Sequence, residues 1–139
     1  MSRFFELALW IAGLGHFCLL LASAQVPSRL HWKQDLAGLA PFNRKLMWAY
    51  GGFTVLTIAA FGTLTLTLHD ELLRGDRAAI GLAGFIGVYW SARLAVDAFY
   101  FDHADWPPGR QFVLGHALLV MLFVFLAATY LGLLLWRLA

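Results

Sequence analysis

The chain has very little charge for its length. Of its 139 residues, 13% are charged and 61% are hydrophobic, whereas soluble domains carry about 25% charged and roughly 45–50% apolar residues. A domain of this size folded in water buries only about two-thirds of the surface of its unfolded chain, so its few polar residues could not cover what remains. The composition excludes a disordered tail and predicts a protein whose solvent is a lipid bilayer.

Two further scarcities exclude whole classes of function. The single cysteine, Cys18, lies in an apolar run, so neither an intramolecular disulfide nor a CxxC redox or zinc motif can form. Ten basic residues stand against eight acidic ones, which gives a net charge of +2. No long basic run is present that could follow a phosphate backbone. We therefore expect no nucleic-acid partner.

Long apolar segments are what the chain has in abundance. A helix that spans a membrane needs about 20 apolar residues at a rise of 1.5 Å each. Four segments qualify, at about residues 4–24, 46–68, 78–101 and 112–136. They occupy almost the whole chain, which predicts one all-α transmembrane domain over residues 1–139. We expect a polytopic, antiparallel four-helix bundle, with a basic amphipathic loop at 27–45 and with glycines where the helices approach one another closely.

The first apolar segment has a second interpretation. Ala22, Ser23 and Ala24 end an apolar stretch as they would at the cleavage site of a secretory signal peptide. Glu6 in the leading segment and His16 within the apolar run favour a membrane span instead. We therefore keep the segment as a span.

The distribution of basic residues predicts the orientation. The loop after the first span carries an excess of positive charge: Arg29, Lys33, Arg44 and Lys45 against Asp35. The loop after the second span does not: Arg74 and Arg77 against Asp70, Glu71 and Asp76. Cytoplasmic loops carry the excess of Lys and Arg. We therefore expect an integral protein of a bacterial inner membrane, with both termini on the non-cytoplasmic side.

Four polar residues share one face of the third span. Tyr89, Arg93, Asp97 and Tyr100 are separated by four, four and three residues, which places them on one side of a helix. A charged residue at the centre of a span costs roughly 2.5–3.5 kcal/mol, so this face should point into the bundle. Arg93 and Asp97 are spaced to neutralise each other as an ion pair.

Three more polar residues should lie at the same depth. Counted from the predicted cytoplasmic ends of their spans, Tyr50, His16 and His116 fall with Arg93 and Asp97 in a layer roughly 6–12 Å below that interface. This layer predicts a site for a small amphipathic ligand such as a quinone or a lipid, or else a contact within a homo-oligomer or a larger membrane complex. Arg93 would anchor an anion or a carbonyl and Asp97 would orient it. Tyr50 and Tyr89 would donate hydrogen bonds, while His16 and His116 would exchange protons.

Other chemistries fit the same residues. Gly15-His16 and Gly115-His116 could supply two axial ligands to a haem, each beside a glycine that lets a flat macrocycle approach. A metal-dependent enzyme acting on lipid could use the residue types that bind zinc or iron. Its candidate ligands are His31, Asp97, Asp102, His103, Asp105 and His116. A proton-coupled transporter would need carboxylates in its path, for which Glu6 and Asp97 are the candidates.

Overall fold

The structure is a computed structural model that describes residues 2–101 and 109–138. Its four long helices are α1 (Ser2–Arg29), α3 (Pro41–Thr67), α5 (Arg77–Phe99) and α6 (Arg110–Leu138). Each is long and apolar enough to cross a membrane, and the described residues contain no strand. The prediction of an all-α, polytopic fold is confirmed.

Short elements connect the long helices. One turn of helix α2 (Trp32–Asp35) and a 3-10 turn η1 (Leu36–Gly38) lie between α1 and α3, and α4 (His69–Arg74) lies between α3 and α5. The first connection is shorter than the predicted loop at 27–45, because α1 continues through Pro27 to Arg29 and α3 already begins at Pro41. Proline suits the first turn of a helix, where its missing N–H would have no partner.

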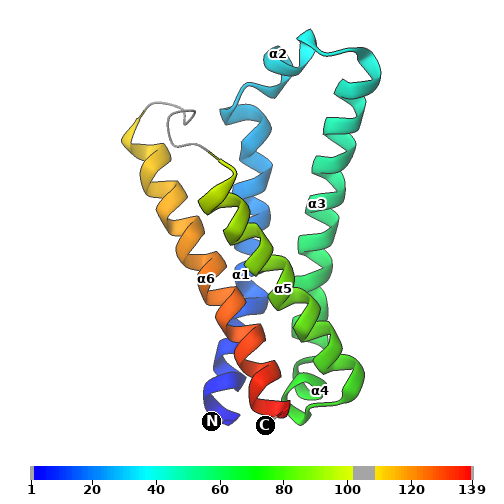
Figure 1. Cartoon of the computed structure of the whole chain (residues 1–139), viewed down its shortest axis with the longest axis vertical. Coiled ribbons are helices and arrows are strands. Elements are labelled where there is room, and N and C mark those ends of the chain that lie inside the picture. The colour runs from blue at the N-terminus through cyan, green and yellow to red at the C-terminus, as the bar shows by residue number, and fades with distance from the viewer. Residues whose placement is uncertain (1, 102–108, 139) are drawn as a thin grey trace.

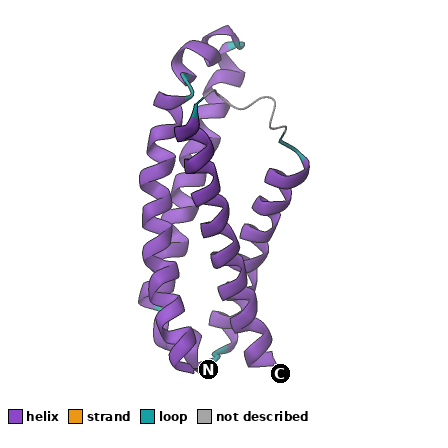
Figure 2. Ribbon diagram, turned by 90° about the vertical axis from the view of Figure 1, so that its left-hand side faces the viewer, coloured by secondary structure: helices purple, strands orange, loops and turns teal. Residues whose placement is uncertain are grey.

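The helices run up and down, so the bundle has two distinct ends. Both termini and α4 lie at one end, and the α2–η1 connection lies at the other (Figure 1). We call the part of the bundle nearer the termini the terminal half, and the part nearer α2 the loop half. The turned view shows that the helices lie closest in the terminal half and diverge toward the loop half (Figure 2).

Glycines let the helices of each close pair touch. A Cβ atom at Gly62 of α3 would lie 2.9 Å from the Cβ of His16 and 3.2 Å from the carbonyl oxygen of Gly13, both on α1. A Cβ atom at Gly87 of α5 would lie 2.6 Å from a methyl group of Leu131 on α6. Transmembrane helices pack by such close approach because lipid supplies no hydrophobic drive between them. The bundle is therefore built from an α1–α3 pair and an α5–α6 pair.

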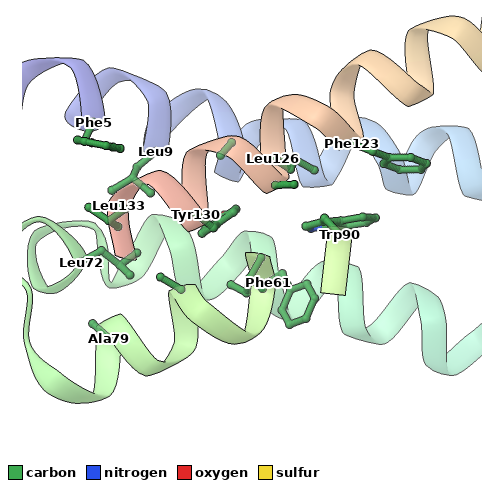
Figure 3. Packing of buried hydrophobic residues seen from close by; sticks show 14 of the residues in the cluster. Phe5, Leu9, Phe61, Leu72, Ala79, Trp90, Phe123, Leu126, Tyr130 and Leu133 are labelled. Atoms are coloured by element: carbon green, nitrogen blue, oxygen red, sulfur yellow. The ribbon is translucent and has the colours of Figure 1, made fainter. Parts of the chain in front are cut away.

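The buried side chains of the four spans lie in the terminal half and around the middle of the bundle. Along α1 they end at Leu19 and along α5 at Trp90, whereas on α3 they begin at Ile58 and on α6 at Phe123. Figure 3 shows this core, with the rings of Trp90 and Phe123 face to face, their centroids 5.1 Å apart. Beyond these four residues, toward α2, no residue is buried within the described part of the chain.

Buried polar groups in the terminal half bond to one another. The Tyr130 hydroxyl of α6 lies 2.6 Å from Thr65 Oγ1 of α3, and Thr65 itself donates to the carbonyl of Phe61. The ring of His69 on α4 bonds through Nε2 to the carbonyl oxygen of Glu6 on α1 at 3.0 Å. Such bonds are needed where no water can satisfy a polar group. The Tyr130–Thr65 bond joins the two helix pairs, and the His69–Glu6 bond holds α4 against α1.

Candidate functional site

A cavity of about 180 Å³ begins where the core ends. All four long helices line it: Ser23 comes from α1, Thr54 from α3, Arg93 from α5 and Phe123 from α6. Trp90 also lines it, and this side chain is 2% exposed and belongs to the core. The cavity therefore has the packed terminal half as its floor and lies in the diverging loop half.

Arg93 is the charged residue of this cavity. Its guanidinium carbon lies 5.3 Å from the ring centroid of Phe123 and 5.5 Å from that of Phe101, which are cation–π distances. Its Nη1 atom is buried and has no hydrogen-bond partner within the described residues. The rings stabilise the charge of the guanidinium, but they leave this N–H donor unsatisfied.

The expected ion pair between Arg93 and Asp97 is not found among the described residues. Asp97 Oδ1 instead lies 2.6 Å from Nε2 of His116 on α6, and both side chains are 16% exposed. Side chains on a helix lean toward its N-terminus. Arg93 therefore points away from Asp97, which follows it by one turn, and this order of charges is the weaker one for a helical pair. The facing helix supplies the partner of Asp97.

His16 belongs to the floor of the cavity. It is fully buried, its Nδ1 donates to the carbonyl of Ala12 at 2.8 Å, and its Nε2 accepts a hydrogen bond from Nε1–H of Trp90 at 3.0 Å. This assignment makes His16 a neutral imidazole with both nitrogens in use. Neither a proton nor an iron atom can bind it without displacing Trp90, so the structure does not favour a haem between His16 and His116.

The three tyrosines expected in the polar layer lie in different places. Tyr89 is half-buried, lines the cavity and packs edge-on against Phe61 and Trp90. Tyr50 and Tyr100 are 62% and 80% exposed on the outer surface of the bundle. Only Tyr89 can donate a hydrogen bond to a molecule bound in the cavity.

Of the expected metal ligands, Asp97 and His116 lie together in the described structure, with 2.6 Å between Oδ1 and Nε2. Asp102, His103 and Asp105 lie outside the described residues. His31 is exposed and holds a left-handed backbone conformation (φ 56°) at the start of α2. In the part of the chain that is described, no cluster of three or more His, Cys, Asp or Glu residues could hold a metal ion.

An apolar groove of about 390 Å³ adjoins the cavity between α1 and α3. Trp32, Trp48, Gly51 and Gly52 line it, and the two indoles meet edge to face with centroids 5.5 Å apart. The groove shares Ser23, Val26 and Thr54 with the cavity, so the two spaces are neighbours along the same pair of helices. The Trp90–His16 bond and this groove are features that sequence reasoning missed.

Small residues and one proline explain why the groove is there. Gly51 and Gly52 leave α3 without side chains at this level. On α1, Pro27 has no N–H to donate to the carbonyl of Ser23, four residues earlier, and its ring disturbs the helix there. The adjacent glycines and the proline inside an apolar run are the sequence signals that mark the groove.

Comparisons with protein-family models, with curated proteins and with solved structures find no match for this chain. The geometry defines what the site can do chemically. It offers one fixed cation with an unsatisfied donor, one tyrosine hydroxyl, apolar walls, and an Asp97–His116 pair one helical turn farther toward the loop end.

Proposed function

We propose that this protein binds a small amphipathic molecule within the membrane, with the polar head of the molecule in the cavity beside Arg93. The observation that carries the proposal is the buried Nη1 of Arg93, which has no hydrogen-bond partner among residues 2–101 and 109–138 and belongs to a side chain that lines the cavity. A guanidinium stays charged at any ordinary pH. An unsatisfied buried donor costs about 1–3 kcal/mol, so a bound hydrogen-bond acceptor relieves that cost.

The walls of the cavity favour a ligand that is polar at one end only. Leu19, Ile58 and Leu119 line it beside Arg93, and the apolar groove adjoins it. Binding sites of this kind are mostly apolar, with a few polar groups that fix the orientation of the ligand. A quinone carbonyl and a lipid headgroup are the two head chemistries that this pattern admits.

The other functions have weaker support. Haem binding would require His16 to give up its bond with Trp90. Transport would need a path that joins carboxylates, but Glu6 lies in the terminal half and Asp97 in the loop half, paired with His116. Neither alternative explains the unpartnered donor of Arg93.

The experiment compares three proteins and two probes. Wild type, Arg93→Gln and the control Arg110→Gln are purified in mild detergent and mixed with oleate or decylubiquinone, and the melting temperature is measured. Arg110 is exposed at the start of α6, so its variant removes a charge from the same end of the bundle. At least one probe should raise the melting temperature of wild type and Arg110→Gln, but not that of Arg93→Gln. Equal responses of all three proteins, or no response to either probe, would overturn the proposal.

The orientation is part of the same proposal. The excess of basic residues in and beside the α1–α3 connection favours a cytoplasmic position for the loop half, and with it for the cavity. Both termini then lie on the opposite side of a bacterial inner membrane. Reporter fusions at the C-terminus check this, because a reporter that is active only outside the cytoplasm should be active there and one that needs the cytoplasm should be silent.

A further inference from the structure

We infer that the molecule bound beside Arg93 is a long-chain amphiphile with an oxyanion head, and that its chain lies in the groove between α1 and α3. This inference rests on the proposed function and names the chemical class of the ligand. Two observations carry it: within the described residues Arg93 has no carboxylate partner and keeps a buried donor unsatisfied, and the cavity adjoins the groove through three shared lining residues.

The charge of Arg93 indicates the chemical class of the ligand's head group. Within the described residues no carboxylate lies within 4 Å of its guanidinium, and the acidic residue nearest along the helix, Asp97, is bonded to His116. A buried cation in a membrane protein needs a counter-charge. A neutral quinone carbonyl would accept one hydrogen bond and leave that charge uncompensated, whereas a carboxylate or phosphate oxygen supplies both the acceptor and the charge.

The walls shared by the cavity and the groove indicate where the hydrocarbon chain of the ligand lies. Ser23, Val26 and Thr54 line both the cavity and the groove, and none of the three is buried. A ligand with its head at Arg93 therefore has only these side chains to pass on the way to the groove. The way toward the terminal half is closed by Trp90, which stacks on Phe123 and bonds to His16. The groove is the apolar continuation that the chain of the ligand requires.

The lining of the groove fits a hydrocarbon chain that comes from the bilayer. Ala24 and Gly52 are exposed on the lipid-facing side of α1 and α3, and Trp48 is 45% exposed. Tryptophans of this kind gather at the boundary between lipid and water. We therefore place the opening for the ligand on the α1–α3 surface, near the loop end, rather than in the aqueous loops.

The first arm of the test varies the head group of the probe and keeps its hydrocarbon chain the same. Oleate, oleoyl lysophosphatidate and uncharged oleyl alcohol share a chain, and decylubiquinone is the neutral quinone. Thermal-shift titrations in detergent should give binding by one or both oxyanions, weakened by roughly 10- to 100-fold in Arg93→Gln, and no Arg93-dependent binding of the alcohol. The two oxyanions distinguish a carboxylate from a phosphate head.

The second arm locates the chain. A fatty acid with a diazirine at its chain end is bound and irradiated, and the labelled residues are mapped by mass spectrometry. Labels should fall in residues 23–27 and 48–55. Gly52 lines the groove, and a Cβ atom at this position would meet no atom within 4 Å. Gly52→Phe should therefore fold, narrow the groove and bind oleate at least tenfold more weakly. The control is Gly81→Phe, because Gly81 is equally open but lies on α5 away from the groove.

The outcomes separate the inference from the proposed function. Arg93-dependent binding of decylubiquinone without binding of either oxyanion overturns the inference and leaves the proposed function standing. Oleate binding with labels outside the groove, or unchanged binding in Gly52→Phe, overturns the place of the chain. If no probe binds in an Arg93-dependent way, both the inference and the proposed function fail.

Discussion

The two halves of the bundle, built from the same four helices, differ in whether their buried polar groups have hydrogen-bond partners. In the terminal half the polar side chains His16, Thr65 and Tyr130 are buried. Each is hydrogen-bonded to a group on a facing helix, and His16 and Thr65 also bond to a carbonyl of their own helix. In the loop half Arg93 lines a cavity and keeps a buried donor that has no partner in the part of the chain that the structure describes. A polar group that is satisfied within the protein stabilises packing, whereas one left unsatisfied beside empty space is where a ligand can bind.

The largest contrast should come from deleting a large ring in each half. Trp90→Ala removes the floor of the cavity and leaves His16 Nε2 without its donor, so we expect a loss of about 3–5 kcal/mol in the free energy of unfolding. Phe99 lies on the same helix in the loop half and is 89% exposed. Phe99→Ala should change stability by less than about 0.5 kcal/mol. Unfolding by SDS in mixed micelles measures both, and similar losses would remove the distinction between the halves.

Adding one methyl group should give opposite signs in the two halves. Gly62→Ala forces a Cβ against His16 and against the backbone of Gly13, which should destabilise the protein by about 1–3 kcal/mol. At Gly52 the space is open, so Gly52→Ala should stabilise the helix by roughly 0.5–1 kcal/mol. The same SDS titration decides between these signs. A destabilising Gly52→Ala would mean that the groove is closed in the membrane.

Arg93→Leu should stabilise the ligand-free protein by about 1 kcal/mol. The substitution removes from an apolar cavity a charged group whose donor is unsatisfied among the described residues. Binding sites commonly lower the stability of the folds that hold them. The melting temperature of delipidated wild type and variant gives the comparison. A large destabilisation would show instead that Arg93 is a structural residue.

The smallest effect concerns a single hydrogen bond of the terminal half. A double-mutant cycle with Thr65→Val and Tyr130→Phe should give a coupling free energy of about 0.6 kcal/mol, since hydrogen bonds between transmembrane helices average that value. The cycle isolates the contact because each variant keeps the shape of the side chain. A coupling near zero would show that this bond does not help to join the two helix pairs.

The fold followed from the sequence because length and hydropathy alone determine a transmembrane helix. The four predicted spans lie within the four long helices, apart from a residue or two at their C-terminal ends. Helical spacing predicted that Arg93 and Tyr89 share one face of their helix, and both line the cavity. Depth does not say which side of a helix a residue occupies, and so Tyr50 was expected inside the bundle although it lies on the outer surface.

Which side chains bond to one another was harder to predict than how deep each residue lies in the membrane. The spacing of Arg93 and Asp97 suggested one ion pair, but side chains lean toward the helix N-terminus and His116 reaches Asp97 from α6. The partner of His16 is Trp90, 74 residues away along the chain. Contacts of this kind depend on how helices are rotated against one another, which hydropathy does not specify.

The most direct test of the central claim, that the loop half is a ligand site centred on Arg93, is an experimental structure of the protein in lipid nanodiscs. Elongated density should begin at the Arg93 guanidinium and continue past Ser23 into the groove beside Trp48. A cavity filled by side chains, with Arg93 paired to Asp97 and no density in the groove, would contradict the account.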